Sequence, residues 1–335
     1  MTNESIDLLY LSLSDILGLE LTFQDVISIV EQSFAEHGKK KVENPPKLAI
    51  HPLEDAFINA MPAFFPDKKT CGVKWVSGFP ANVSKGIPSI AATLILNDPE
   101  NGMPVAFMDA THITNVRTVA VSAVAAKHLC DKDASLLAIV GCGVQGTNHA
   151  IAMASVVPSI STVKIFDIYK PSVDSFIDVI HKRVPSFNLK VCSSPEETIK
   201  EADLVITATG KLLKPIYKNE WVKKGALVLP VHTLGWDAST PSNMDKFITD
   251  DWAQFRTVGD IHYQPLPDTP YAETGEIVAG LKPGRENKEE RIVNFNKGLA
   301  CHDILMATTI LHKAREKGVG TTLTLQEPNQ QVSFI

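Results

Sequence analysis

A short apolar run that ends in three spaced glycines constrains the fold of this chain more than any other feature. Residues 136–140 read Leu-Leu-Ala-Ile-Val and lead directly into Gly141-x-Gly143-x-x-Gly146. A plausible helix over residues 147–156 follows, so the order is strand, tight turn and helix. This order is typical of a dinucleotide-binding unit, in which the glycines allow a sharp turn, a close approach of the pyrophosphate and close helix packing. The free N–H groups at the start of the helix would face the phosphates.

An acidic residue some twenty positions further on indicates which nucleotide is bound. Residues 163–167 read Val-Lys-Ile-Phe-Asp and predict a second strand that ends in the carboxylate of Asp167. A carboxylate at this place accepts hydrogen bonds from the ribose 2′-hydroxyl and repels a 2′-phosphate. The sequence therefore predicts NAD(H) as the cofactor. The alternative is a glycine turn in an α/β domain that binds no ligand.

The composition bounds the remaining possibilities. A chain of 335 residues predicts two domains, and 44% apolar with 21% charged residues is typical of a soluble protein with a large core. The net charge of −6 provides no basic field for nucleic acid or an anionic membrane. The N-terminal residues are polar and acidic, and no apolar run approaches the roughly 18 residues of a membrane span. We therefore expect a cytoplasmic protein without nucleic-acid or membrane partners.

The cysteines and histidines indicate neither a disulfide framework nor a metal site. The five cysteines are scattered and form no C-x-x-C pair, and the ten histidines show no H-x-H or H-x-x-x-H spacing. Cys301 and His302 are neighbours, but adjacent helical residues point in different directions. We therefore predict no metal cofactor.

The segments before the fingerprint predict a domain of mixed helices and strands. Residues 8–13 read as a strand, and helix starts are expected at Ser14 and Thr22. Residues 47–110 read as short strands separated by turns, with a hairpin turn at 97–102. An alanine-rich helix with Thr114 or Asn115 as its N-cap then runs to residue 129.

After Asp167 the chain alternates between strands and helices, which predicts a doubly wound parallel sheet. A buried helix over residues 301–317 could return to the first domain and make that domain discontinuous. Residues 282–290 read as a charged surface loop. The expected strands cover residues 190–192, 204–209, 226–231, 247–251 and 292–295, with a helix starting at Pro195.

Three cations in apolar surroundings are candidates for substrate binding: Lys47, Lys74 and Arg117. Buried cations require an anion, since an unpaired buried charge is costly. That anion is either a protein carboxylate or the carboxylate of a substrate, for which the arginine fork is suited. The expected position of Arg117 in the first turn of a helix favours a ligand, because a cation is electrostatically unfavourable there.

One acidic residue is a candidate for proton transfer. Asp237 follows the strand at 226–231, at the edge where ligands sit in doubly wound sheets. Its carboxylate could move protons to or from a substrate amine, or it could cap the turn that follows. Thr207, Ala208 and Thr209 are small enough to lie against a cofactor, whereas Gly298 and Asp303 are less decisive.

Over nearly its whole length the sequence resembles the ornithine cyclodeaminase/mu-crystallin family. The matching segments are 72–74, 94–100 with 104–106, 115–118, 141–146, 207–209, Asp237, 298–303 and 318–323. The resemblance implies a Rossmann-type doubly wound parallel sheet plus a discontinuous α+β substrate-binding and dimerisation domain. We place the NAD-binding domain at residues 126–304, the other domain at 1–125 and 305–335, and expect a homodimer.

The resemblance also implies roles for single residues. Lys74 and Arg117 would bind the substrate α-carboxylate, with Lys47 where many members carry arginine, and Asp237 would shuttle protons with Lys74 as a second catalytic residue. The predicted cofactor-binding residues are Thr118, Gly141, Gly143, Val144, Gln145, Gly146, Asp167, Thr207, Ala208, Thr209 and Gly298.

Two departures from the family pattern argue against ornithine as the substrate. Ornithine enzymes usually read Gly-Gly-Asp-x-Pro-Gly-Lys-Thr-Glu around the acid, whereas residues 235–243 read Gly-Trp-Asp-Ala-Ser-Thr-Pro-Ser-Asn. This places bulky Trp236 in the wall expected to face the distal amine. Residues 295–298, Phe-Asn-Lys-Gly, replace the common Asp-Ser-x-Gly.

The leading hypothesis is an NAD(H)-dependent oxidoreductase acting on the C–N bond of a small α-amino or α-imino acid, of the amino acid dehydrogenase or ketimine reductase type. The alternatives are an ornithine cyclodeaminase with catalytic NAD and a mu-crystallin-like binding protein with little turnover. A pure binder needs no proton shuttle, so Asp237 argues against the last of these.

Overall fold

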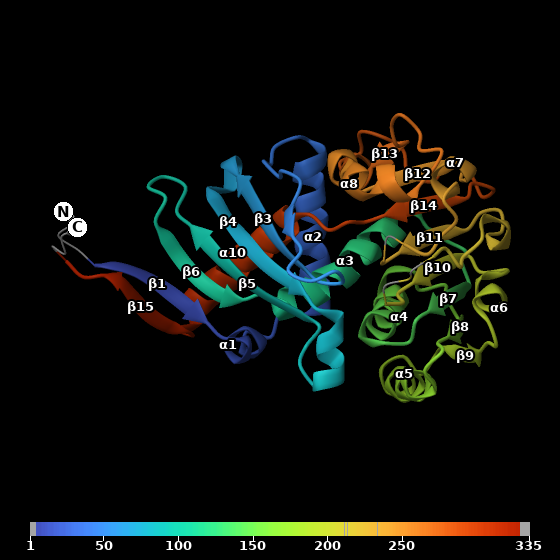
Figure 1. Cartoon of the computed structure of the whole chain (residues 1–335), viewed down its shortest axis with the longest axis horizontal. Helices are drawn as coiled ribbons and strands as arrows, with labels where there is room; N and C mark the ends of the chain where they lie inside the picture. Colours follow the sequence, from blue (N-terminus) through green and yellow to red (C-terminus); the bar gives the residue numbers. More distant parts are fainter. Residues whose placement is uncertain (1–4, 211, 213, 233, 329–335) are drawn as a thin grey trace. The chain divides into compact units, whose positions relative to one another are not determined.

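The chain forms two compact units in the computed structural model, which describes residues 5–328 except 211, 213 and 233 (Figure 1). Unit 1 takes its residues from 1–33, 40–117 and 299–335, and unit 2 from 34–39 and 118–298. The division falls inside two helices, α2 (Phe23–Gly38) and α3 (Thr111–Leu129).

A seven-stranded sheet forms the framework of unit 1, in the order β15-β1-β6-β5-β4-β3-β2. Neighbouring strands are antiparallel except β1 and β6, which are parallel. The expected hairpin at residues 97–102 is present and joins β5 to β6. The strands are β1 (Ile6–Leu11), β2 (Leu48–Ile50), β3 (Phe57–Phe65), β4 (Thr70–Gly78), β5 (Ile90–Asn97), β6 (Pro104–Asp109) and β15 (Thr321–Gln326).

Helix α10 (Ala300–Lys317) covers one face of this sheet, packing on β3, β4 and β5 (Figure 1). Along β3, Met61, Ala63 and Phe65 are buried and alternate with half-buried residues, as expected for a strand with one core face. The pairing of β15 with β1 joins the two ends of the chain, a contact between distant segments that no local pattern indicates.

Polar caps set where the helices of unit 1 begin. A reciprocal box between Ser12 and Asp15 starts α1 (Leu13–Gly18), slightly earlier than the expected start at Ser14. The expected box at the second helix is present, because the Thr22 hydroxyl accepts from the Asp25 backbone N–H and the Asp25 carboxylate from that of Thr22. Two short 3-10 turns, η1 (Pro66–Lys68) and η2 (Pro80–Lys85), connect strands.

Unit 2 is built on eight parallel strands in the order β13-β12-β14-β11-β10-β7-β8-β9, which confirms the doubly wound sheet. The strands are β7 (Leu136–Val140), β8 (Thr162–Phe166), β9 (Asn188–Val191), β10 (Leu204–Thr207), β11 (Leu227–Pro230), β12 (Lys246–Thr249), β13 (Ala272–Glu273) and β14 (Ile292–Phe295).

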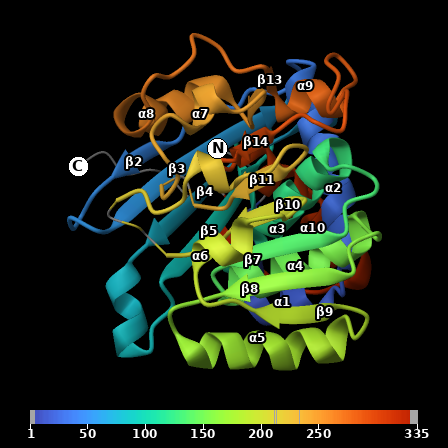
Figure 2. The same ribbon diagram turned by 90° about the vertical axis from the view of Figure 1, so that its right-hand side faces the viewer.

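Helices lie on both faces of the sheet of unit 2. Helices α4 (Val144–Val156) and α5 (Lys170–Arg183) cover one face and α6 (Pro195–Ile199) lies on the other (Figures 1 and 2). The remaining elements of unit 2 are η3 (Asn219–Trp221), α7 (Thr240–Asn243), α8 (Trp252–His262) and α9 (Thr274–Val278). Central strands such as β10 and β11 are buried on both faces, which explains their continuous apolar sequence.

The expected start of helix α3 was wrong. Helix α3 begins at Thr111, before the expected caps at Thr114 and Asn115, because the Asp109 carboxylate accepts from the backbone N–H of Thr111. Arg117 is therefore beyond the first turn, and the argument from the helix dipole does not apply to it.

The charged segment 282–290 is a loop, as expected, with residues 286–289 exposed, and one of its side chains also contacts the end of α3. The half-buried Arg285 guanidinium donates through Nε to the Leu129 carbonyl at the end of α3 and through Nη1 to the Glu290 carbonyl. Within the described residues, no helix combines the length and the apolar character that crossing a membrane requires.

Candidate functional site

The glycine fingerprint forms a tight turn at the carboxyl end of β7. Gly141 has φ of +104°, and a Cβ there would lie 2.6 Å from the Ala208 carbonyl. A Cβ on Gly146 would lie 1.8 Å from the Gly141 oxygen, so α4 can pack this close only on glycine. These two positions therefore require glycine for the fold itself.

Gly143 differs from its two neighbours in the motif, because a Cβ there would meet nothing within 4 Å. It is the N-cap of α4, which begins at Val144 rather than at residue 147 as expected. The Val144 side chain is 69% exposed beside it. Open space in front of the first N–H groups of a 13-residue helix fits a pyrophosphate, since these groups and the helix dipole favour an anion.

The Asp167 carboxylate lies beside this turn, at the carboxyl end of β8. Its Oδ2 accepts from the Cys142 N–H at 2.8 Å and its Oδ1 from the Tyr169 N–H at 2.9 Å. These bonds orient the carboxylate toward the fingerprint and leave further lone pairs on both oxygens for ribose hydroxyls. The residues present therefore fit a dinucleotide with an unmodified ribose.

Two apolar side chains that the sequence analysis missed flank this carboxylate. Ile168 is 93% exposed and Tyr169 63% exposed. Apolar groups left in solvent at a strand end, where ligands of such sheets bind, suit a flat ring such as a nucleobase. The signal in the sequence was an apolar pair directly after the strand-ending acid.

A buried histidine holds the start of α4 in place. His149 Nδ1 lies 2.7 Å from the Gln145 carbonyl, and Nε2 lies 3.0 Å from the Ser122 hydroxyl on α3. Burial lowers the pKa of His149 to about 4, so the ring is neutral at pH 7. Its hydrogen bonds tie the cofactor-facing turn of α4 to α3, the helix on which half-buried Thr118 also lies.

The hydroxyls that end β10 serve the structure. Thr207 Oγ1 accepts from Trp236 Nε1 at 3.2 Å, and the Thr209 and Tyr217 hydroxyls lie 3.1 Å apart. Trp236 is 1% exposed and packs against Tyr217 in the core of unit 2. The expectation that Trp236 lines an open wall is therefore wrong, because its indole N–H and ring are both used inside this unit.

Asp237 follows Trp236 with a half-buried carboxylate. Oδ2 accepts from the Asn219 N–H at 3.0 Å, and the Asp237 N–H donates to the Tyr217 carbonyl at 3.0 Å. The carboxylate therefore holds the start of η3, which precedes it in the chain, and not the turn that follows it as considered from the sequence. Among the described residues no hydrogen bond to Oδ1 occurs, so one oxygen is left for proton transfer.

Gly298 adopts a positive φ of 82° and is anchored by a buried acid. Its N–H donates to Asp250 Oδ2 at 2.6 Å. Asp250 directly follows β12, so Gly298 lies at the same carboxyl edge of the sheet as the fingerprint.

In unit 1 the structure brings Lys74 and Arg117 together around one acid. Lys74 Nζ lies 2.5 Å from Asp303 Oδ2, and Arg117 Nε lies 3.2 Å from Asp303 Oδ1. Asp303, which the sequence analysis left undecided, belongs to the first turn of α10 and is fully buried. The protein carboxylate considered for these two cations is therefore present.

Charge and burial act strongly on Lys74. Burial, the Arg117 charge and the Lys47 charge lower the pKa of Lys74 to about 7, while Asp303 opposes this shift. The influence of Lys47, which is half-buried, shows that all three cations of the sequence analysis gather in unit 1.

A separate cluster in unit 2 contains residue types that can ligate a metal: His37, Asp251 and Glu273, with ligand atoms within 4.8 Å of one another. His37 Nε2 lies 3.4 Å from Asp251 Oδ2. Asp251 caps α8 through the Gln254 N–H, and Glu273 accepts from the Trp252 N–H. Helix capping accounts for both carboxylates in this arrangement.

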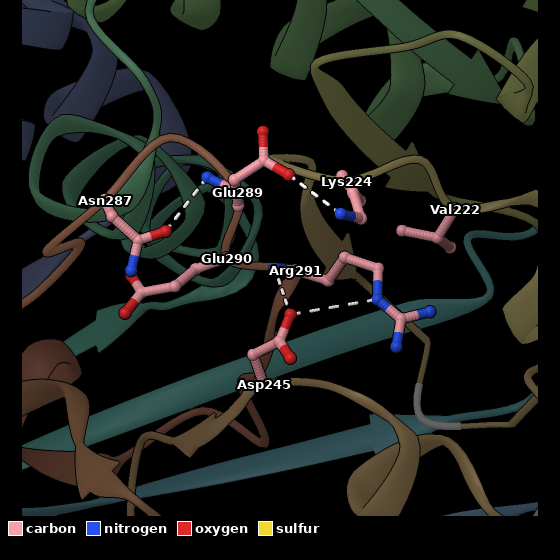
Figure 3. A pocket seen from close by; sticks show the side chains of 7 residues that line it. All are labelled: Val222, Lys224, Asp245, Asn287, Glu289, Glu290 and Arg291. Carbon is pink, nitrogen blue, oxygen red and sulfur yellow. Dashed lines mark hydrogen bonds and ion pairs between the residues drawn. The ribbon is translucent and has the colours of Figure 1, made fainter.

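A polar cavity of about 570 Å³ lies elsewhere in unit 2 (Figure 3). Val222, Asp245 and Arg291 line it, and they precede β11, β12 and β14. The cavity is therefore at the amino edge of the sheet, whereas ligands of such sheets bind at the carboxyl edge. Its charged side chains also pair with each other, Lys224 with Glu289 and Arg291 with Asp245.

Comparison with known proteins identifies a family model and relatives that match nearly the whole chain. The family model of the ornithine cyclodeaminase/mu-crystallin family matches residues 10–318. The nodulation efficiency protein NfeD of Rhizobium meliloti is 35% identical over 322 residues, 94% of this chain and 98% of that protein.

Two solved structures share the fold and more than a quarter of the sequence. Thermococcus litoralis Δ(1)-pyrroline-2-carboxylate reductase, in complex with NADH and L-proline, has a TM-score of 0.83 and 32% identity, covering 94% of this chain and 99% of that one. An archaeal alanine dehydrogenase dimer with bound NAD has a TM-score of 0.84 and 30% identity, covering 95% and 99%.

Proposed function

The chain belongs to the ornithine cyclodeaminase/mu-crystallin family, and on that premise we propose that it is an NAD(H)-dependent oxidoreductase acting on the C–N bond of a small α-amino or α-imino acid. The observation that carries the proposal is the charge balance in unit 1. Asp303 brings one negative charge to two cationic side chains, Arg117 and the protonated form of Lys74. A substrate carboxylate would supply the second negative charge.

Unit 2 would hold the cofactor. The N–H groups at the start of α4 would bind the pyrophosphate, and Asp167 would accept from the ribose hydroxyls. When bound, NAD(H) accepts or supplies the hydride. Similar proteins described with NADH and with NAD support this assignment.

The substrate would be held and protonated by this chain's own side chains. Arg117, Lys74 and Lys47 would anchor the α-carboxylate, with the arginine fork giving a bidentate contact. Asp237 would move a proton at the substrate nitrogen through Oδ1, since the Asn219 N–H occupies Oδ2. Release of ammonia without net oxidation would instead indicate a cyclodeaminase.

We also propose a homodimer. The sheet face opposite α10 exposes Trp75, Leu48 and Ile50 to 47%, 75% and 55%. Leu48 and Trp75 lie in one cross-strand row through Ala60, so they share this face. Clustered exposed apolar side chains suit a second copy, and the similar alanine dehydrogenase is a dimer.

The homodimer is tested by measuring the sedimentation of the wild type and of Trp75→Glu. Equal masses of the two proteins in solution would contradict the proposed interface. A cytoplasmic location stays a prediction.

The reaction is tested by incubating the protein with NAD and a panel of amino acids, and with NADH and the matching imino acids, while recording nicotinamide absorbance and ammonia. Net NADH formation or consumption supports the proposal. Ammonia without net NADH indicates cyclodeaminase chemistry. No change with either set, while NAD binds, contradicts turnover on this substrate class.

The role of Asp237 is tested separately by Asp237→Asn. We expect turnover to fall by about 10²- to 10⁴-fold, the range for loss of a general acid or base, with NAD affinity unchanged. Asp178→Asn, on an exposed site of α5, is the matched control. Near-normal turnover in Asp237→Asn would exclude this acid as the proton shuttle.

A further inference from the structure

Three charged side chains from three distant segments meet inside unit 1. Lys74 lies on β4, Arg117 on α3 and Asp303 on α10, so the topology, and no local motif, brings them together. Lys74 and Asp303 side chains are 0% exposed, whereas that of Arg117 is 10% exposed. Of these three side chains, that of Arg117 is the one that reaches solvent.

The contact between Arg117 and Asp303 is made through Nε, the inner nitrogen of the guanidinium. In the described part of the chain, neither terminal nitrogen of Arg117 takes part in a hydrogen bond. Nε and Asp303 Oδ1 form an ion pair without a hydrogen bond, so the carboxylate holds the guanidinium by charge, and the terminal fork matches the two oxygens of a carboxylate. Asp303 is thus the inner carboxylate, beside Nε of Arg117. The terminal nitrogens of Arg117 form the outer position, where the carboxylate of a substrate would bind.

Asp303 also compensates the charge of the pair. Two buried cations next to each other repel, and removing their shared carboxylate would leave both unpaired in a dry environment. A first-turn aspartate has some value for the helix dipole alone. That role is satisfied by a solvent-facing side chain, however, and does not explain why Asp303 is buried between two cations.

Resting on the proposed function, we propose that Asp303 is the positioning residue of the carboxylate anchor: it accepts a hydrogen bond from Lys74 Nζ and forms an ion pair with Arg117 Nε, so that the outer fork of Arg117 is presented to the substrate carboxylate. Asp303 itself does not touch the substrate. It acts through the two cations, which makes its effect specific to carboxylate binding and independent of the cofactor.

The first test compares Asp303→Asn with Asp303→Glu and with the control Glu316→Gln on the exposed end of α10. We expect Asp303→Asn to raise KM for the amino or imino acid by about tenfold or more while the Kd for NAD stays within about twofold. Asp303→Glu should recover part of the loss. A KM within about twofold of wild type in Asp303→Asn overturns the inference, and so does an equal loss in Asp303→Glu.

The pH profile gives a readout that a purely structural role would not move. The groups facing Lys74 are Arg117, Lys47 and Asp303, and only Asp303 favours its protonated form. Asp303→Asn should therefore shift the alkaline limb of the kcat/KM profile to lower pH. If the alkaline limb of the kcat/KM profile of Asp303→Asn stays at the wild-type pH, the inference is overturned.

A second variant applies if Asp303→Asn fails to fold. Arg117→Lys keeps the charge and Asp303 but lacks the fork, so KM should rise by about tenfold with little change in the pH profile. A wild-type KM in this variant overturns the inference.

A further measurement separates this inference from the proposed function. NMR of lysine-labelled protein can follow the titration of Lys74, identified by its absence in Lys74→Met. We expect the midpoint to fall in Asp303→Asn even if no substrate is found. Absence of turnover in wild type would defeat the proposed function alone, whereas an unmoved midpoint would defeat the role of Asp303.

Discussion

The two sites of this protein are built to receive negative charge by different means. In unit 2 consecutive backbone groups between β7 and α4 face an open space over Gly143. In unit 1 side chains from β4 and α3 share one buried carboxylate from α10. A backbone site is encoded by a few neighbouring residues, while a side-chain site depends on the packing of the whole unit. Substitutions should therefore affect the two sites differently.

The largest effect is expected at Gly146. Gly146→Val places a Cβ 1.8 Å from the Gly141 oxygen, so α4 must move away from β7 and unit 2 should lose about 3 kcal/mol or more of unfolding free energy. Gly143→Ala is the matched control, since its Cβ meets nothing; it should keep stability within about 1 kcal/mol and weaken NAD binding. Urea unfolding measures the stability of both variants, and calorimetry measures their affinity for NAD. Equal stability of the two variants would show that close packing at Gly146 is not required.

The next effect concerns the cofactor preference of unit 2. Asp167→Ser removes the carboxylate that accepts from Cys142 and Tyr169. We expect the Kd for NAD to rise by about 10- to 100-fold and the discrimination against NADP to fall, because hydrogen bonds to a charged group contribute about 1.5–3 kcal/mol. Asp178→Ser on α5 serves as control. An unchanged preference for NAD would exclude Asp167 as the ribose contact.

In unit 1, Lys74 should make the unfolding free energy depend on pH. Burial, with Arg117 and Lys47, lowers the pKa of Lys74 from 10.5 to about 7. Between these values the unfolded chain binds a proton that the folded chain has lost, so the unfolding free energy rises with pH across this window. Lys74→Met should remove this rise.

The change should exceed about 1.4 kcal/mol, the equivalent of one pKa unit. Denaturant unfolding at about pH 7 and pH 9.5 measures it, with Lys317→Met on the exposed end of α10 as control. A wild-type pH dependence in Lys74→Met would show that Lys74 titrates as in the unfolded chain.

The smallest effect tests whether the end of β10 serves structure or ligand. Thr207→Val removes the acceptor of the buried Trp236 N–H. An unpaired buried donor costs about 1–3 kcal/mol, so a modest loss of stability with intact NAD affinity is expected. Thr207→Ser should retain the stability. A loss of NAD affinity without a loss of stability would assign Thr207 to the cofactor instead.

Patterns of neighbouring residues predicted much of the fold. The glycine fingerprint, the alternation of apolar runs and the hairpin at 97–102 each report on neighbouring residues, and the structure has the corresponding elements. The start of α3 was missed although its signal is local, because Asp109 lies two residues before Thr111 and accepts from its backbone N–H. The pairing of β1 with β15 joins opposite ends of the chain and has no local signal.

The candidate site also has parts that the sequence predicted and parts that only the tertiary structure shows. The sequence by itself determined the dinucleotide turn, because Gly146 packs against Gly141 within the same motif, and it identified Lys47, Lys74 and Arg117 as cations in apolar surroundings. Only the tertiary structure decided that Asp303 is the shared partner of Lys74 and Arg117 and that Trp236 lies in the core. A charge in an apolar segment shows that a partner is needed, but which distant residue supplies it depends on how strands and helices pack.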